Sequence, residues 1–161
     1  MNESVLIEQR LLEELRSRSL TFAAAESCTG GLIAKRITDL SSASAVFRGG
    51  VVSYTNEVKR DVLGVEQELL DEYGAVSAPV AQAMAEGARR ITGADYAVSV
   101  TGVAGPDKDD RGNDVGTVYL ALAHSSGTVC TKFCFDGDRS AIRSAAADTA
   151  FSLILHQLKE N

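Results

Sequence analysis

Ser27 is the first residue whose neighbours suggest chemistry, because it stands in the small-residue segment Glu26-Ser27-Cys28-Thr29-Gly30-Gly31. The apolar run before this segment predicts a buried strand, and the paired glycines predict the start of a helix. The first N–H groups of a helix have no partner within it, so they favour an anion or a developing oxyanion. Ser27 is therefore a candidate nucleophile, and its neighbours are candidates for binding the substrate: Thr29, Gly30 and Gly31. An ordinary helix N-cap, the more frequent reason for such residues, is the alternative.

The same segment lacks two known motifs and contains a rival nucleophile. It is not a Walker loop, because no Gly-Lys-Ser/Thr follows, and it is not a G-x-S-x-G elbow, because the first glycine is missing before Ser27. Cys28 would also lie near a helix N-terminus, which lowers the pKa of a thiol. The alternative is that Cys28 fills a small buried space.

Lys59 is the candidate base that a serine nucleophile needs. Asn56 is predicted to cap a short helix that ends near Leu63, so Lys59 would lie near the third position of that helix. The helix dipole and the adjacent Arg60 both disfavour a charged ammonium, which lowers the pKa of Lys59. A neutral amine can accept the serine proton. A solvated lysine is the commoner case, but Tyr54 and Asn56 at the same turn favour a substrate-orienting site.

Two further loops add candidates for the site. Thr101 follows a predicted strand and could hydrogen-bond a substrate or polarise the serine, while an ordinary strand-end threonine is the alternative. Gly102 and Gly105 lie in the same loop and are candidates for contact with the substrate. Arg139 follows Asp138, a predicted helix cap, where it could bind a phosphate or remain a surface residue without a partner.

The remaining polar residues do not form a metal-binding pattern. Residues 107–114 are acidic but do not have the EF-hand spacing, so we expect a mobile, solvated loop that could act as a lid. Cys130 and Cys134 have no second pair of ligands near them in sequence, which argues against a structural zinc site. His124 and His156 are expected to be surface or partly buried residues.

Helical and strand patterns alternate along most of the chain, which is typical of an α/β fold. Strands are predicted over 21–25, 50–54, 95–100, 115–123 and 128–135, and helices over 5–18, 32–40, 56–63, 66–72, 77–91 and 138–158. The last two strands are expected to form an antiparallel hairpin. We predict three α/β/α layers around a mixed, mostly parallel sheet, with ligands bound at the carboxyl ends of the strands.

Composition narrows the class of protein. The chain has 161 residues, 45% hydrophobic and 24% charged, so we expect residues 1–161 to form a single globular domain. The net charge of −6 argues against a general nucleic-acid binder. No apolar run approaches the ~20 residues of a membrane span. The N-terminus carries Glu3 and no Lys or Arg, so we expect no secretory signal and a cytoplasmic location.

Several short motifs occur in a fixed order between about residues 22 and 143. They are Ala25-Glu26-Ser27-Cys28-Thr29-Gly30-Gly31, Phe47-x-Gly49-Gly50-Val51-Val52-x-Tyr54-x-Asn56-x-x-Lys59, Gly74-Ala75-Val76-Ser77, Gly93-Ala94-Asp95-Tyr96-Ala97, Thr101-Gly102-x-Ala104-Gly105-Pro106, Val115-Gly116-Thr117-Val118 and Gly137-Asp138-Arg139. No single motif is specific, but the ordered set resembles the CinA C-terminal domain family.

The resemblance implies an enzyme, since the enzymatic members of this family are nicotinamide-nucleotide amidohydrolases. They hydrolyse nicotinamide mononucleotide to nicotinate mononucleotide and ammonia. The resemblance implies Ser27 as the nucleophile and Lys59 as the base. It links three further positions to the site: Tyr54, Thr101 and Ser44. It implies no metal or redox cofactor, and a homodimer or a higher homo-oligomer as the assembled form.

The loop over residues 108–114 departs from the family pattern, in which glycines and a Lys-Pro pair are usual. This departure bears on substrate affinity and specificity. Two alternatives to the nucleotide amidase are a hydrolase for another amide and a non-catalytic nucleotide-binding or interaction module of the competence type. The joint presence of the four candidate catalytic residues favours the enzyme: Ser27, Tyr54, Lys59 and Thr101.

Overall fold

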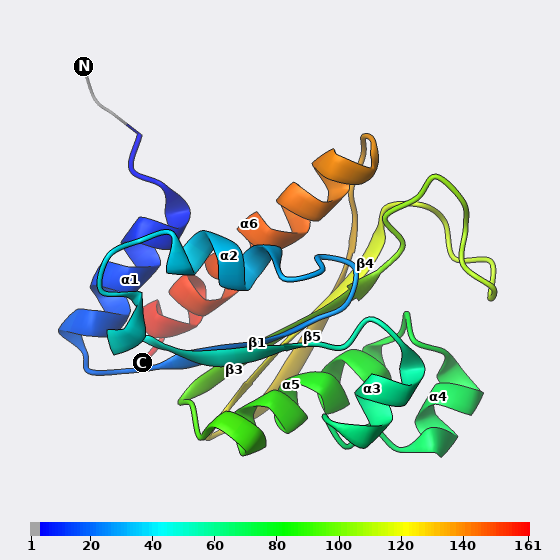
Figure 1. Ribbon diagram of the computed structural model, residues 1–161, viewed down its shortest axis with the longest axis horizontal. Coiled ribbons are helices and arrows are strands. Elements are labelled where there is room, and N and C mark those ends of the chain that lie inside the picture. Colours follow the sequence, from blue (N-terminus) through cyan, green and yellow to red (C-terminus); the bar gives the residue numbers. More distant parts are fainter. Residues whose placement is uncertain (1–3) are drawn as a thin grey trace.

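The computed structural model describes residues 4–161 and shows a five-stranded sheet with helices on both faces (Figure 1). The strand order is β2-β1-β3-β4-β5. The strands are β1 (Phe22–Glu26), β2 (Phe47–Val52), β3 (Tyr96–Gly102), β4 (Thr117–His124) and β5 (Gly127–Cys134). β1 pairs in parallel with β2 and β3, whereas the β3–β4 and β4–β5 pairs are antiparallel. The predicted α/β/α fold with a mixed sheet is confirmed.

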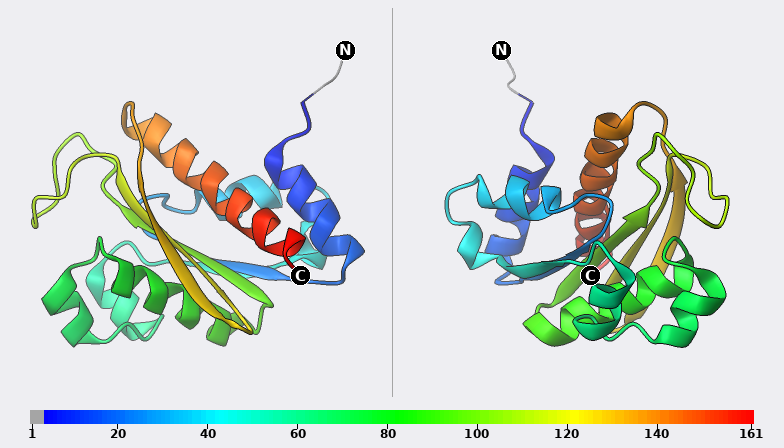
Figure 2. Two further views of the ribbon diagram at one scale, coloured as in Figure 1. Left: turned by 180° about the vertical axis from the view of Figure 1, so that it is seen from behind. Right: turned by 45° about the vertical axis from the view of Figure 1, so that its right-hand side comes forward.

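Different helices cover the two faces of the sheet, as Figure 2 shows from two further directions. One face carries α1 (Ile7–Ser17), α2 (Leu32–Thr38) and α6 (Arg139–Lys159), and the other carries α3 (Asn56–Asp61), α4 (Gln67–Tyr73) and α5 (Ala78–Thr92). A short 3-10 helix, η1 (Ala43–Ala45), precedes β2. Residues 1–3, which include the Glu3 on which the expected lack of a secretory signal rests, lie outside the described residues.

β1 lies between two parallel partners and is buried along its whole length. Successive side chains of a strand point to opposite faces of the sheet. Accordingly, Phe22 and Ala24 join the apolar cluster under α6, whereas Ala23 and Ala25 join the cluster under α5. A continuous apolar run suits a strand that is covered on both faces. The polar segment that begins at Glu26 therefore emerges at the carboxyl edge of the sheet.

Two boundaries near the candidate site differ from the prediction. β2 begins at Phe47 rather than at residue 50, and it ends at Val52, so Tyr54 follows the strand instead of belonging to it. Thr55, not Asn56, caps α3, because the Thr55 hydroxyl accepts a hydrogen bond from the Val58 N–H. Thr55 has the extended backbone of a cap residue, and Asn56 is already the first helical residue.

Gly87 sets the distance between α5 and the segment that follows α3. A Cβ atom on Gly87 would collide with the carbonyl oxygen of Leu63. The same segment returns to α3 through the Val65 N–H, which donates to the Lys59 carbonyl oxygen at 3.0 Å. The missing side chain on α5 therefore allows α3 and its following turn to pack closely against this face of the sheet.

Candidate active site

A cavity of about 260 Å³ lies where polar segments leave the carboxyl ends of β1, β2 and β3. Ligands of α/β proteins usually bind at this edge of the sheet. The cavity is lined by Ser27, Cys28, Tyr54, Asn56, Lys59, Ala75, Val76, Thr101, Gly102, Ala104 and Arg139. All four candidate catalytic residues are in this set. Three of the small lining residues were not predicted from the sequence to have a role: Ala75, Val76 and Ala104.

Ser27 and Lys59 meet inside this cavity although they are distant in sequence. The Lys59 Nζ atom donates to Ser27 Oγ at 2.9 Å and to the carbonyl oxygen of Ser53 at 2.7 Å. The Lys59 residue is only 1% exposed, and Ser27 is 8% exposed. Two fixed acceptors thus hold the amine beside the hydroxyl. A neutral amine in this position is within reach of the serine proton.

Burial lowers the pKa of Lys59 to about 8, because water no longer solvates the ammonium form. Cys28 acts weakly in the opposite direction. The lowered pKa agrees with the prediction, but its cause is different. Lys59 lies in the last turn of the short α3 rather than at a positive helix end, and the exposed Arg60 forms an ion pair with Asp61. Desolvation, not charge repulsion, thus increases the fraction of this lysine that is present as the neutral amine.

Glu26 occupies the helix start at which the sequence analysis placed an oxyanion. Its carboxylate is buried and accepts hydrogen bonds from the N–H groups of Ile33 at 2.8 Å and Ala34 at 3.1 Å. These two groups of α2 are therefore not free for a substrate. Cys28 lines the cavity, and its N–H group, which forms no hydrogen bond with another of residues 4–161, is a remaining donor beside the serine.

Arg143 of α6 holds the turn that carries Ser27, and the sequence analysis did not identify it. Its Nε atom donates to the Cys28 carbonyl oxygen at 3.1 Å, and its Nη2 atom donates to the Thr29 carbonyl oxygen at 2.9 Å. The turn is thus held at two places. Glu26 ties the end of β1 to the start of α2, and Arg143 binds the carbonyl oxygens of the turn from α6. No local sequence signal marks this contact, because Arg143 and the turn are more than 100 residues apart.

Arg139 and Tyr54 form a polar edge of the cavity. Arg139 Nη2 donates to the Tyr54 hydroxyl at 3.0 Å, and Arg139 Nη1 donates to the Gly105 carbonyl oxygen at 2.7 Å. Asp138 caps α6 as predicted, through a hydrogen bond from the Ala141 N–H. Tyr54 is 58% exposed, and its hydroxyl bonds to Arg139 rather than to the buried amine of Lys59. The pair presents a cationic and a hydroxyl group to an entering ligand.

Thr101 is buried, and its hydroxyl already has a partner. It donates to the Ala75 carbonyl oxygen at 2.8 Å, and this bond joins β3 to the segment between α4 and α5. Thr101 therefore does not donate to Ser27 here, although both residues line the cavity. Gly102 and Asn56 also line the cavity, as the sequence analysis expected of candidate binding residues.

Some predicted binding residues lie outside the cavity wall. Ser44 is exposed on η1, which precedes β2 and is therefore at the opposite end of that strand from the polar segments. Thr29 is fully buried, and its hydroxyl has no hydrogen-bond partner within residues 4–161. Gly30 and Gly31 shape the turn before α2 without lining the cavity, and Gly105 contributes only a carbonyl oxygen to Arg139.

Cys28 lines the cavity, but it is a poor rival to Ser27. Burial raises the pKa of the Cys28 thiol to about 11, which keeps the sulfur protonated near neutral pH. The nucleophilic form of cysteine is the thiolate, so the expected lowering by a helix end does not occur. The amine of Lys59 donates to the serine hydroxyl and not to the sulfur. The geometry therefore favours the oxygen nucleophile.

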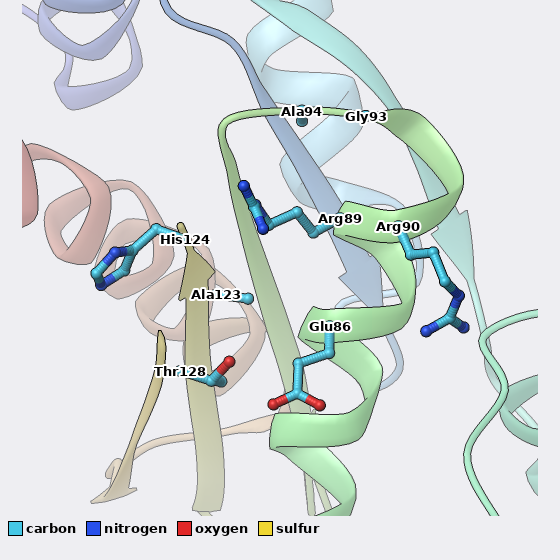
Figure 3. Close-up of a pocket in the computed structure, with 8 residues that line it drawn as sticks. All are labelled: Glu86, Arg89, Arg90, Gly93, Ala94, Ala123, His124 and Thr128. Atoms are coloured by element: carbon cyan, nitrogen blue, oxygen red, sulfur yellow. The ribbon is translucent and has the colours of Figure 1, made fainter. Parts of the chain in front are cut away.

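A larger cavity of about 440 Å³ lies at the other end of the sheet (Figure 3). Its walls come from α5, which carries Glu86, Arg89 and Arg90, and from the β4–β5 hairpin at His124 and Thr128. Both arginines lie in the last turn of α5, where cations stabilise a helix. Arg89 donates to the Asp95 carbonyl oxygen, and Arg90 donates to the Leu63 carbonyl oxygen. No residue predicted for catalysis or binding lies there.

Residues 4–161 show neither a cluster of metal-binding side chains nor a membrane-spanning helix. These residues contain no group of three or more His, Cys, Asp or Glu side chains that could hold a metal ion. None of their helices is both long enough and apolar enough to cross a lipid bilayer.

Sequence comparisons relate the chain to proteins of two lengths. A family model described as the CinA C-terminal domain matches residues 5–158. The nicotinamide-nucleotide amidohydrolase PncC of Escherichia coli is 43% identical over 161 residues, which are 99% of this chain and 98% of that protein. A CinA-like protein of Geobacter sulfurreducens is 51% identical over 152 residues, which are 94% of this chain and 37% of that protein. The chain thus spans about a third of the longer relatives.

Solved structures share the fold over almost the whole chain. A CinA superfamily protein from Klebsiella pneumoniae has a TM-score of 0.94 and 32% identity, and the match covers 96% of this chain and 97% of that one. A competence/damage inducible protein from Agrobacterium tumefaciens has a TM-score of 0.90 and 38% identity, with 97% and 99% covered.

Proposed function

The chain belongs to the CinA C-terminal domain family, and we propose that it hydrolyses nicotinamide mononucleotide to nicotinate mononucleotide and ammonia. One observation carries the proposal: the buried amine of Lys59 lies 2.9 Å from the Ser27 hydroxyl inside a cavity. The relative that is named for this activity and matches over its full length supports the choice of substrate.

Acylation begins with proton transfer from Ser27 to Lys59. The neutral amine takes the hydroxyl proton as the Ser27 Oγ atom attacks the carbon of the substrate carboxamide. The carbonyl oxygen becomes an oxyanion, for which the N–H group of Cys28 is an available donor. Lys59, now an ammonium, returns its proton to the departing nitrogen. Ammonia leaves, and an ester between Ser27 and the nicotinoyl group remains.

Deacylation uses the same amine in the reverse sense. Lys59 accepts a proton from water, whose oxygen attacks the ester carbon, and it then returns that proton to the Ser27 oxygen. The products are the pyridine carboxylate and the free serine. Tyr54 is an alternative proton donor for the departing ammonia, and its hydroxyl would have to leave Arg139 for that role.

The rest of the cavity suits a nucleotide bearing a phosphate. Arg139 is the one guanidinium among the cavity-lining residues, and it supplies a planar set of donors that matches phosphate oxygens. Asn56, Thr101 and Gly102 line the remaining wall, where small and polar groups leave space for a ring and a sugar. Binding of the phosphate at Arg139 would place the carboxamide toward the buried end of the cavity.

The decisive experiment compares Ser27→Ala with the unchanged protein in an assay of ammonia release from nicotinamide mononucleotide. We expect Ser27→Ala to lower kcat by at least about 10³-fold, because the nucleophile is gone, while the circular dichroism spectrum is unchanged. Ser125→Ala, an exposed serine in the β4–β5 turn, is the matched control and should keep full activity. Full turnover in Ser27→Ala would remove Ser27 from the mechanism.

A non-catalytic nucleotide-binding module is the second candidate function. It is favoured by the names of relatives that refer to CinA or competence rather than to a reaction. Calorimetry separates the two candidates. Binding of nicotinamide mononucleotide without ammonia release by the unchanged protein would support the binding module, whereas turnover would support the amidase.

A further inference from the structure

The loop between β3 and β4 is held by its own side chains. The Asp109 carboxylate accepts hydrogen bonds from the Arg111 N–H at 3.1 Å and from the Asn113 N–H at 2.7 Å. The Asn113 side-chain amide donates to the other oxygen of the same carboxylate at 2.7 Å. Lys108 forms an ion pair with Asp114 at 2.8 Å. Asp109 and Asp114 therefore serve the internal structure of the loop.

Arg111 is the residue that ties this loop to the rest of the molecule. Its Nη1 atom donates to the Glu72 carbonyl oxygen at 2.9 Å, and its Nη2 atom donates to the carbonyl oxygens of Asp71 and, at 3.3 Å, Leu70. These three oxygens belong to the last turn of α4. The last carbonyl groups of a helix lack partners within it and carry partial negative charge. A guanidinium satisfies several of them at once.

Gly74, which ends α4, fits this contact. A Cβ atom on Gly74 would lie 2.7 Å from both Cδ and Nε of Arg111, which is closer than Cβ atoms approach other heavy atoms. The missing side chain therefore leaves a channel for the stem of the arginine. We define the Arg111 latch as Arg111, Gly74 and the carbonyl oxygens of residues 70–72.

The latch is next to the wall of the cavity. Ala75 and Val76, which line the cavity, follow Gly74 directly. Thr101 of β3 binds the Ala75 carbonyl oxygen at 2.8 Å, so this wall is anchored from the sheet on one side and from α4 on the other. Loss of either anchor would let the wall move relative to Ser27 and Lys59.

We propose that Arg111 is a positioning residue, which fixes the Ala75–Val76 wall and so sets the fit of the substrate without touching the reacting atoms. This inference rests on the proposed function for its kinetic part only. The distinctive loop sequence thereby shapes the cavity from outside, through the end of a helix. Lysine cannot reproduce the contact fully, because an ammonium is a point donor and cannot span three carbonyl oxygens.

The first test measures amide hydrogen exchange in Arg111→Ala, Arg111→Lys and the matched control Lys108→Ala. We expect the amides of residues 70–77 to exchange about tenfold faster in Arg111→Ala, with a smaller increase in Arg111→Lys. Lys108→Ala removes a cation whose partner Asp114 belongs to the same loop, so exchange in 70–77 should stay unchanged. Unchanged exchange in Arg111→Ala, or an equal increase in the control, would overturn the latch.

The second test measures ammonia release from nicotinamide mononucleotide by the same variants. Arg111→Ala should raise KM about fivefold and leave kcat within about twofold, because the wall binds the substrate and does not react. Lys108→Ala should match the unchanged protein. Faster exchange together with an unchanged KM would overturn the link to the cavity. If the unchanged protein released no ammonia, the proposed function would fail, while the exchange experiment would still decide the latch.

Discussion

At the scale of single residues, Lys59 shows how burial creates a base. The protein keeps its amine from water and offers it two hydrogen-bond acceptors but no carboxylate among its hydrogen-bond partners. Its pKa of about 8 therefore comes mainly from desolvation. The same burial lowers the free energy of unfolding, because on folding the ammonium group must give up either its proton or its hydrating water molecules. Burial of Lys59 should accordingly favour the proposed reaction while it reduces the stability of the fold.

Lys59→Met tests that cost through the pH dependence of stability. The unfolded chain has the ordinary lysine pKa of about 10.4, so between about pH 8 and pH 10.4 it binds more protons than the folded chain. Stability from this group therefore rises with pH across that window, and the cost is fully present below about pH 8. From pH 7 to pH 10, the unchanged protein should gain about 2 kcal/mol relative to Lys59→Met in urea unfolding.

Lys159→Met is the matched control, because Lys159 is exposed near the end of α6. Its unfolding free energy should follow the unchanged protein at both pH values. Parallel pH curves for Lys59→Met and the unchanged protein would contradict a lowered pKa for the buried amine. Lys59→Met should also release no measurable ammonia at any pH.

At the scale of elements, the start of α2 depends on one carboxylate. Glu26 is the last residue of β1, and its carboxylate accepts hydrogen bonds from two N–H groups in the first turn of α2. A single buried side chain therefore joins the strand to the helix. Glu26→Ala should destabilise the protein by about 2–3 kcal/mol, because two buried donors lose a charged acceptor. Urea unfolding measures the loss. Glu86→Ala, at an exposed position of α5, should change stability by less than about 0.5 kcal/mol.

The elements themselves could be predicted from sequence because their signals are local. The apolar run before Glu26 and the residues around Asp138 were sufficient to predict β1 and the start of α6, since period and capping act within a few residues. Ser27 and Lys59 could be predicted as candidates because each follows a strand with suitable chemistry. Their contact depends on how α3 packs, which no local pattern specifies.

The interactions that sequence could not reveal all join distant segments. Arg143 binds the turn after β1 from the opposite end of the chain, and Arg111 binds the end of α4 across 39 residues. The local sequence around an arginine is the same whether or not the folded chain brings carbonyl oxygens within reach of its guanidinium. Ser44 shows the reverse case, because a position linked to the site by resemblance lies on η1, away from the cavity.

At the scale of the whole molecule, the site takes its two central groups from opposite layers. Ser27 precedes α2 on one face of the sheet, whereas Lys59 belongs to α3 on the other. The apolar clusters on the two faces therefore hold the two groups in place, mainly through residues that do not line the cavity. Damage to one cluster should reduce stability while the folded molecules keep their chemistry.

Phe151→Ala tests this separation. Phe151 is fully buried on α6 and makes an edge-on contact with Phe22 of β1. Its truncation should lower the unfolding free energy by about 3–5 kcal/mol. At a temperature where the variant remains folded, kcat per folded molecule should stay within about twofold of the unchanged protein. A much larger drop in kcat would mean that this cluster also tunes the geometry of the site.

Gly87 is a position where a standard substitution for raising thermal stability should fail. Alanine in the middle of a helix is normally an improvement of roughly 1 kcal/mol over glycine. Here the added methyl would push the Leu63 carbonyl, and through Val65 it would push the backbone of Lys59. A substitution chosen from helix statistics alone would thus disturb the backbone that positions the buried amine beside its serine. The helix-propensity gain expected at α5 would therefore be outweighed by the collision with backbone atoms of Leu63, and we expect Gly87→Ala to be less stable than the unchanged protein.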